Sequence, residues 1–391
     1  MARNQKVALL VLLVFLVSIV AGCSSSKTGD KAADQGKEAI LGVSAELSGG
    51  VASYGTSCKD GIMLAIDEIN AAGGVNGQKI APEVVDTKSD AAEATNVAAK
   101  LMDKKVVAVI GPLTSGNVKA TAPVVTQNKV PLIAPAATAD DVTIANGKVR
   151  EYIFRTCFSD SFQGILMADF ASKNLGKKTA ALLVDNSNDY SKGLAKNFKE
   201  EFTKLGGTIV TEEACVKGDR DFKATLTKIK SKNPEFLYIP NYYEEAAPAI
   251  KQARELGITV PVGGADGWDS PELVSAAGAS ALNSAFITSH YSTQDTDPKI
   301  VKFISSFKAK YNKEPDSFAA LGYDAVYLWA DAAKRAGKND AASVTKALAE
   351  TKDFAGVTGK MTVDENHNVV KAGVIIEYKD GKQTMNTKIQ P

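Results

Sequence analysis

Two loops in the first half of the sequence carry hydroxyl groups suited to anion binding. Residues 111–116 read Gly-Pro-Leu-Thr-Ser-Gly and residues 134–138 read Ala-Pro-Ala-Ala-Thr, each after a short β-branched run. Backbone N–H groups at a helix start favour an anion, so Ser115 and Thr138 could hold a carboxylate without a lysine. Each could instead be a simple helix N-cap. Because the two loops match in chemistry, we expect a shared ligand site, and neither has a phosphate-loop pattern.

An aspartate between glycines provides the opposite charge. Residues 263–269 read Gly-Gly-Ala-Asp-Gly-Trp-Asp after another apolar run. Asp266 could approach a ligand closely, with Trp268 as an apolar wall beside it, although a plain turn with an exposed aspartate is the alternative. Aromatic hydroxyls at Tyr190 and Tyr242 also follow strand candidates. Aromatic residues in loops are more often functional than those inside strands, so we include both in the candidate site.

Catalytic and metal chemistry have few candidate residues. The sequence has only two histidines, so we expect neither a histidine-based metal site nor a Ser-His-Asp triad. Cys58, Cys157 and Cys215 lack metal-site spacing, and we expect them to be free and partly buried, with one disulfide as the alternative. No nucleophile with a base and no cofactor fingerprint is evident. We therefore expect a protein that is not an enzyme and uses no cofactor or metal.

The N-terminus has the pattern of an export signal. Arg3 and Lys6 precede an apolar run at residues 7–20, which is shorter than the roughly 20 residues that span a bilayer. Ala21 and Gly22 then precede Cys23, a pattern that resembles the bacterial lipobox, in which the cysteine is lipidated. We expect a lipoprotein signal peptide at 1–22, a lipid on Cys23 and a flexible tether at 23–38. An ordinary signal with a chance cysteine is the alternative.

Composition excludes several classes of protein. The 391 residues include 46 basic and 45 acidic residues, mixed along the chain, so nothing favours nucleic acid as a partner. A mature chain of about 350 residues is too long for one comfortable core, which predicts two domains.

The elements that must position these residues alternate between short apolar runs and longer amphipathic segments. Strands are expected at 40–45, 80–85, 106–110, 130–134, 152–156, 179–184, 208–212, 236–239, 260–262 and 285–288. Helices are expected at 59–72, 91–104, 162–174, 191–205, 222–232, 244–256, 298–311, 317–336 and 341–351, before a final apolar pair at 360–363 and 369–378. This order predicts an α/β protein with parallel-sheet cores, whose ligand lies beyond the carboxyl ends of the strands.

Several motifs occur together in one order over residues 39–382. They are Ala-Ser-Tyr-Gly at 52–55, Asp-Glu-Ile-Asn-Ala-Ala-Gly-Gly-Val-Asn-Gly at 67–77, Val-Ile-Gly-Pro at 109–112, Ala-Pro-Ala-Ala-Thr at 134–138, Phe-Arg-Thr at 154–156 and Gly-Ala-Asp-Gly at 264–267. With them the chain resembles the leucine/isoleucine/valine-binding protein family, the type I periplasmic binding proteins of branched-chain amino acid transporters.

The resemblance implies two Rossmann-like lobes joined by three crossing segments. The N-terminal lobe would comprise 39–157 plus 291–358, and the C-terminal lobe 158–290 plus 359–386. It also implies roles for the site residues. Ser115 and Thr138 would hold the ligand carboxylate, while the Ala136 carbonyl, the Thr138 hydroxyl and Asp266 would hold the ammonium. The wall would consist of Tyr54, Leu113, Thr114, Tyr190, Tyr242, Trp268 and Tyr323. Asp266 is shorter than the glutamate usual in the family.

The function implied is that of the extracytoplasmic binding component of an ABC importer. A monomer, exported and anchored to the membrane by lipid, would capture a free amino acid by hinge closure and deliver it to the permease. A branched-chain amino acid is the first expectation. The alternatives are another amino acid, an amide or urea-type ligand with the same mechanism, or an interaction lipoprotein that binds no solute.

Overall fold

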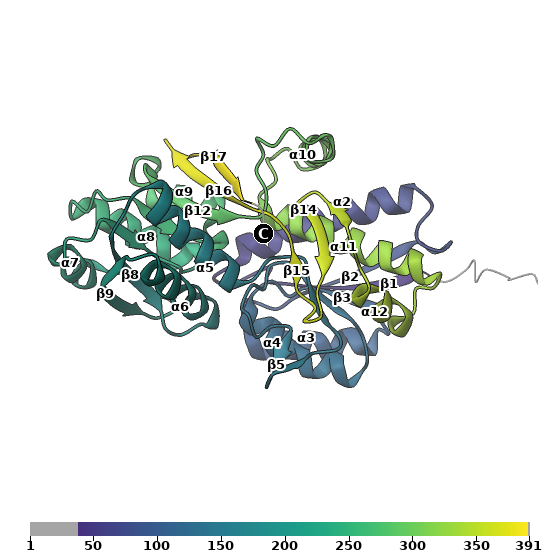
Figure 1. Cartoon of the computed structure of the whole chain (residues 1–391). Coiled ribbons are helices and arrows are strands. Elements are labelled where there is room, and N and C mark those ends of the chain that lie inside the picture. The colour runs from purple at the N-terminus through teal and green to yellow at the C-terminus, as the bar shows by residue number, and fades with distance from the viewer. Residues whose placement is uncertain (1–37, 390–391) are drawn as a thin grey trace, which may run out of the picture. The chain divides into compact units, whose positions relative to one another are not determined.

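The computed structural model describes residues 38–389, which fold around two main sheets (Figure 1). The predicted signal peptide, Cys23 and nearly all of the predicted tether lie outside these residues. Within 38–389, no helix combines the length and the apolar character needed to cross a membrane. Cys58, Cys157 and Cys215 are free and buried, as expected. The α/β class with parallel-sheet cores is confirmed.

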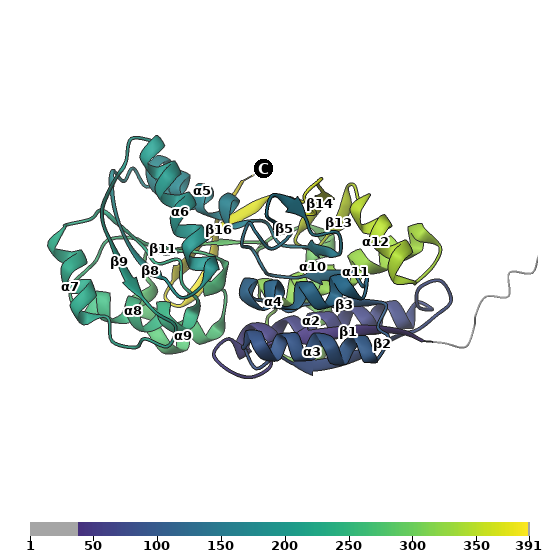
Figure 2. The ribbon, with the colours of Figure 1, turned by 90° about the horizontal axis from the view of Figure 1, so that it is seen from below.

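The first sheet contains five parallel strands in the order β2-β1-β3-β4-β7. Their bounds are β1 (Ala39–Ala45), β2 (Ile80–Asp86), β3 (Ala108–Ile110), β4 (Leu132–Ala134) and β7 (Ile153–Arg155). Helices α2 (Ala52–Ala71) and α11 (Ser317–Ala336) pack on one face, and α3 (Ala91–Asp103) and α4 (Ser115–Gln127) on the other (Figure 2). Because both faces are covered, the inner strands are mostly apolar, which is why they read as continuous runs.

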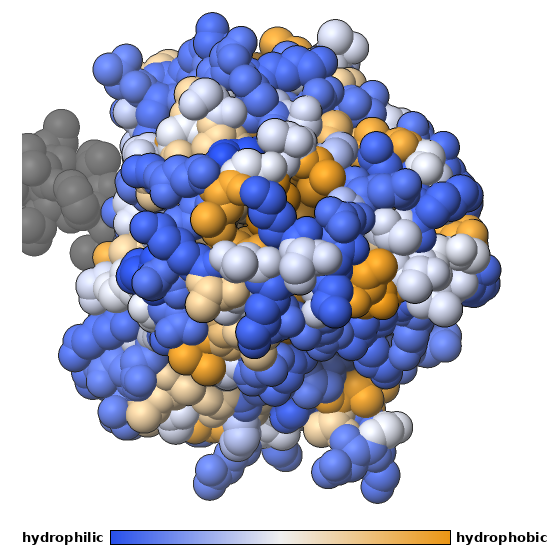
Figure 3. Space-filling model, turned by 90° about the vertical axis from the view of Figure 1, so that its left-hand side faces the viewer, coloured by the Kyte–Doolittle hydropathy of each residue, from blue (hydrophilic) through white to orange (hydrophobic). Residues whose placement is uncertain are grey.

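The second sheet has the order β17-β16-β12-β11-β10-β8-β9. Its parallel strands are β8 (Thr179–Asp185), β9 (Thr208–Cys215), β10 (Phe236–Tyr238), β11 (Val262–Gly264) and β12 (Ala285–Ser289), and the antiparallel edge is β16 (Gly373–Lys379) and β17 (Lys382–Ile389). Helices α5 (Asp160–Asp169) and α6 (Asp189–Lys204) cover one face. The other face is covered by α7 (Lys223–Ser231), α8 (Tyr243–Glu255) and α9 (Pro271–Ala277). The surface around α7 and β9 is mostly hydrophilic, with apolar residues in small patches (Figure 3).

The chain passes between the two sheets three times. It first leaves β7 for α5, and then leaves β12 for α10 (Pro298–Tyr311), α11 and α12 (Ala341–Ala349). The small sheet of β13 (Phe354–Gly356), β14 (Gly359–Val363) and β15 (Val369–Val370) precedes the third passage, into β16. The expected division placed residues 359–370 with the second lobe, whereas Met361, Val363 and Val369 pack in the core of the first sheet.

Helix α2 begins at Ala52, seven residues before the predicted start. The additional turns include Gly55, although glycine is a poor helix former. The structure gives a reason for glycine there, because a Cβ atom at Gly55 would lie 2.0 Å from the carbonyl oxygen of Glu46. This close approach of helix and strand end places Tyr54 above the carboxyl edge of the first sheet.

Candidate functional site

A small cavity lies where loops from the carboxyl ends of both sheets meet. It is lined by Tyr54, Leu113, Thr114, Ala136, Tyr190, Tyr242, Asp266, Gly267 and Phe318. Seven of these nine residues are among the residues expected from the sequence, and they come from segments up to 212 positions apart, from Tyr54 to Asp266. The geometry thus brings most of the predicted wall and the predicted acidic group together.

Four aromatic rings form the apolar part of the cavity. Tyr54 stacks on Phe318 at a centroid distance of 4.2 Å, and Tyr190 stacks on Tyr242 at 4.8 Å. Tyr54 meets Tyr242 edge to face at 5.8 Å, which joins the two stacks. Stacked and edge-to-face pairs are the favoured aromatic geometries, so this box is rigid and suited to an apolar group.

Asp266 contributes the carboxylate of the cavity. It starts a short 3₁₀ turn, η2 (Asp266–Trp268), directly beyond β11, and is 2% exposed. Its Oδ1 accepts a hydrogen bond of 2.8 Å from the Tyr190 hydroxyl, and its Oδ2 lies 3.0 Å from Nε2 of His290. Burial and the nearby Lys371 ammonium lower the pKa of His290 to about 4. The imidazole is therefore neutral near pH 7 and does not cancel the charge of Asp266.

Ser115 and Thr138 do not serve as helix caps. The Ser115 hydroxyl accepts a hydrogen bond of 3.1 Å from the backbone N–H of Ala139, which ties the two predicted anion-binding loops together. Thr138 is fully buried, and its hydroxyl has no partner at standard hydrogen-bond geometry within the described structure. It lies close to the Asp160 carboxyl, whose pKa burial raises well above its usual value and the Thr138 hydroxyl lowers. The Thr138 hydroxyl is therefore available either to Asp160 or to a ligand.

Glu46 occupies part of the site that the sequence analysis left free for a ligand. Its carboxylate accepts hydrogen bonds of 3.1 Å from the backbone N–H groups of both Leu113 and Thr114. The Thr114 hydroxyl at 2.9 Å and Asn117 at 2.8 Å complete its partners. Burial raises the pKa of Glu46. The N–H groups of Leu113 and Thr114 are thus used by the protein itself. The position of Glu46, directly after an apolar strand, was the sequence signal that could have indicated this role.

Two predicted wall residues lie elsewhere. Trp268 is fully buried in the core of the second sheet. It lies two residues after Asp266 in the 3₁₀ turn, so its side chain points to a different side of the turn from Asp266. Tyr323 is five residues beyond Phe318 on α11, which turns it by about 140° from the cavity. Its hydroxyl donates to Glu68 at 2.6 Å. Gly267 and Phe318 line the cavity in their place and were not predicted.

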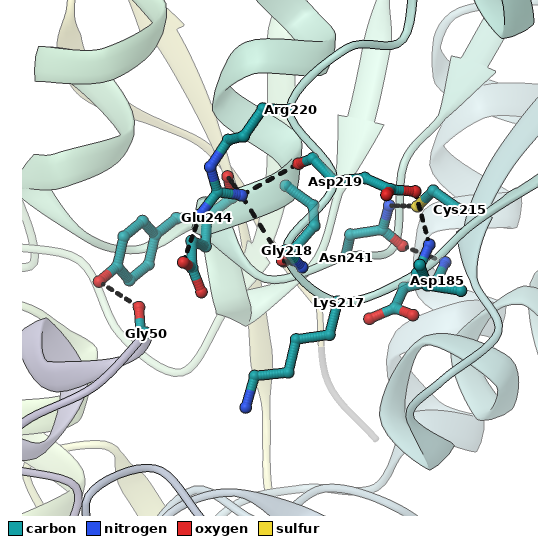
Figure 4. A network of polar contacts seen from close by, with 12 residues as sticks. Gly50, Asp185, Cys215, Lys217, Gly218, Asp219, Arg220, Asn241 and Glu244 are labelled. Atoms are coloured by element: carbon teal, nitrogen blue, oxygen red, sulfur yellow. Dashed lines mark hydrogen bonds and ion pairs between the residues drawn. The ribbon is translucent and has the colours of Figure 1, made fainter.

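Direct contacts join the loops of the two sheets around the cavity. The Tyr54 hydroxyl donates to the Gly267 carbonyl, and the backbone N–H of Ser317 donates to Asp269 at 2.8 Å. Tyr243 donates to the Gly50 carbonyl at 2.9 Å, beside the ion pair of Arg220 with Glu244 (Figure 4). Hydrogen bonds therefore link the loops of the two sheets at and beside the cavity.

Known proteins are similar to this chain in sequence and in fold. The family described as periplasmic binding protein matches residues 40–383. A Leu/Ile/Val-binding protein homologue of Brucella melitensis is 32% identical, with 88% of this chain and 92% of the relative covered. A leucine-, isoleucine-, valine-, threonine- and alanine-binding protein of Pseudomonas aeruginosa is 31% identical over 96% of this chain and 97% of its own.

A solved structure has a similar fold over most of this chain. It is the branched-chain amino acid transporter substrate-binding protein of Streptococcus pneumoniae in complex with isoleucine. The TM-score is 0.86 at 41% identity, with 91% of this chain and 100% of that chain covered. The family match spans most of the chain, and the relatives are solute-binding proteins. The chain belongs to the periplasmic binding protein family, as a substrate-binding protein of the branched-chain amino acid ABC transporter type.

Proposed function

We propose that this protein binds leucine, isoleucine or valine in the cavity around Asp266 and delivers it to an ABC permease. The observation that carries the proposal is the pairing of one buried carboxylate with a box of four aromatic rings. A ligand that suits both has a cationic group and an apolar side chain. The relatives named for these three amino acids support the same ligand class.

The ligand's charges would meet opposite partners. Its ammonium group would lie at Asp266, with the Ala136 carbonyl and the Thr138 hydroxyl as further acceptors. Its carboxylate would accept hydrogen bonds from the Ser115 and Thr138 backbone and hydroxyl groups. Burying both ends of a zwitterion is tolerable only when each is paired and hydrogen-bonded, and this arrangement pairs each one.

The aliphatic side chain would lie against Tyr54, Tyr190, Tyr242 and Phe318, with Leu113 and Thr114 closing the wall. Discrimination among apolar side chains is modest, about 1 to 3 kcal/mol for each methylene. A different amino acid therefore stays the nearest alternative. An amide or urea-type ligand is less well suited, because it would leave the buried charge of Asp266 without a cation.

Capture would use closure of the two lobes expected from the sequence. Contacts such as Tyr54 to Gly267 and Ser317 to Asp269 join loops of the two sheets, and a ligand between them would stabilise the closed form through its greater affinity for that form. The closed monomer would be the form that the permease recognises.

Export and a lipid on Cys23 complete the proposal. An extracytoplasmic location accords with the family. Labelling cells with radioactive palmitate tests the anchor: the wild type should take up label, whereas Cys23→Ser should not. Equal labelling of the two proteins would refute it.

A thermal-shift screen of the purified protein against the twenty amino acids tests the function. A ligand at 100 times its Kd stabilises by about 2.7 kcal/mol, which is readily measured. We expect the largest shifts with leucine, isoleucine and valine. A shift with another amino acid alone would change the ligand and keep the mechanism. No shift with any of them would favour the interaction lipoprotein that binds no solute.

A further inference from the structure

All three segments that pass between the sheets come together around the ring of Phe158, on which His290 stacks. His290 follows β12 at the start of the second passage. Its ring stacks on Phe158 of the first passage at a centroid distance of 3.8 Å and an interplanar angle of 21°. The ammonium of Lys371, in the third passage, lies 6.0 Å from the centre of the same Phe158 ring. Any rotation of one lobe about these passages would change the packing of the imidazole.

The same imidazole contacts Asp266, which lines the cavity. Its Nε2 lies 3.0 Å from Oδ2 of Asp266, and both residues are 2% exposed. Oδ1 of Asp266 separately accepts a hydrogen bond from the hydroxyl of Tyr190, which lies in the first turn of α6. The carboxylate is therefore held by two donors, one from a helix of the second sheet and one from the passages between the sheets.

We propose that His290 is a positioning residue that couples the ligand-binding carboxylate of Asp266 to the hinge. This inference rests on the proposed amino-acid function and deepens it. Stacking on Phe158 fixes the plane of the ring, and the ring fixes one oxygen of Asp266. Lobe closure and correct placement of the carboxylate then require the same arrangement of His290.

The chemistry of histidine suits this role because it can donate a hydrogen bond without carrying charge. A carboxylate accepts from an N–H group, so the tautomer protonated on Nε2 fits the contact. Charged imidazolium would compete with the ligand ammonium for Asp266. Burial and the Lys371 ammonium lower the pKa of His290, and together they outweigh Asp266, which acts in the opposite direction.

Two substitutions separate the donor from the ring. His290→Phe keeps an aromatic ring for Phe158 and removes the donor, whereas His290→Gln keeps a donor and removes the ring. The matched control is His367→Phe, because His367 also stacks on a phenylalanine, Phe154, at 4.2 Å, but bonds only to backbone of the first sheet. We expect His290→Phe to weaken leucine binding by about tenfold or more, with partial recovery in His290→Gln. His367→Phe should bind as the wild type does.

Nitrogen NMR of ¹⁵N-histidine-labelled wild-type protein provides the second readout. With two histidines in the sequence, the two sets of signals can be assigned from the His367→Phe variant. We expect His290 to be the Nε2–H tautomer, neutral at pH 6, with signals that shift when leucine is added while those of His367 stay unchanged.

Three outcomes would overturn the inference. They are an unchanged leucine affinity in His290→Phe, an Nδ1–H tautomer of His290 in the wild type, and His290 signals that do not shift when leucine is added. The NMR result decides the question even if the His290 variants fold poorly. Failure of the proposed function is a different result, because the wild-type protein would then bind no amino acid and neither histidine would respond.

Discussion

The Tyr190 hydroxyl donates a hydrogen bond of 2.8 Å to Oδ1 of Asp266 and accepts one of 2.9 Å from the backbone N–H of Gly267. Tyr190 thus holds both the carboxylate and the turn that carries it. Its ring meanwhile forms part of the apolar box through its stack on Tyr242. One side chain therefore connects the polar and the apolar parts of the cavity.

We predict that Tyr190→Phe weakens leucine binding by about tenfold or more, since hydrogen bonds to charged groups contribute about 1.5 to 3 kcal/mol. Calorimetric titration measures the change. Tyr238→Phe is the control, because Tyr238 in β10 is also buried and its hydroxyl makes no hydrogen bond within residues 38–389. Equal losses of affinity in the two variants would show that the hydroxyl of Tyr190 has no specific role.

Asp266→Asn should remove the preference for a ligand ammonium group. Asparagine keeps the shape and loses the charge, so binding of leucine should fall at least tenfold, with the loss of a charged hydrogen bond as the reason. The wild type should bind leucine far better than the 2-oxo acid that lacks the ammonium, and the variant should narrow this gap. If the difference in affinity between leucine and the 2-oxo acid is the same in the variant as in the wild type, Asp266 does not bind the ammonium group.

Phe318→Ala tests the wall residue that was missed from sequence. It removes one face of the stack on Tyr54 and leaves a cavity, which costs about 3 to 5 kcal/mol of stability at a buried phenylalanine. Phe303→Ala is the matched control, because Phe303 is equally buried in a different cluster. We expect similar thermal destabilisation in both variants of the unliganded protein, but weaker leucine binding in Phe318→Ala alone. Loss of affinity in both would indicate a general loss of structure.

Glu245 should make stability fall as pH rises. Burial raises the pKa of Glu245 from 4.5 to about 7, so the folded protein holds a proton that the unfolded chain releases. This contribution is complete below about pH 4.5 and is lost as the pH rises through 7. Relative to Glu245→Gln, the melting temperature of the wild type should therefore decline between pH 5 and pH 8. The neighbouring Glu244→Gln serves as the control and should keep the wild-type decline, whereas parallel curves for wild type and Glu245→Gln would contradict the prediction.

Helix positions could be predicted where side chains mark both the ends and the buried face. Helices α10 and α11 have the predicted bounds. Their first turns are capped by the side chains of Asp297 and Asp316, respectively. The residues that directly follow their last turns, Asn312 and Gly337, adopt the left-handed conformation that ends a helix. Strand β17 was missed since its side chains are largely half-exposed or exposed along its length, which removes the apolar signal of an inner strand.

The site could be predicted only in part, for a physical reason. A position just beyond a strand places a residue near the carboxyl edge of the sheet, and Asp266 and Tyr190 both line the cavity there. It does not say which side of the next turn the residue faces, and the Trp268 side chain lies in the core of the second sheet. Phe318 reaches the cavity, and Glu46 reaches the loop of Leu113 and Thr114 that lines it, through tertiary packing of segments far apart in sequence.

Calorimetric titration of the purified wild-type protein with isoleucine tests the central claim most directly. We predict one site per chain and a negative heat-capacity change on binding, because an apolar side chain leaves water for a box of aromatic rings. Competition by leucine and valine should lower the apparent affinity for isoleucine. The absence of binding heat over a range of temperatures, with no competition by any of the three, would contradict the account.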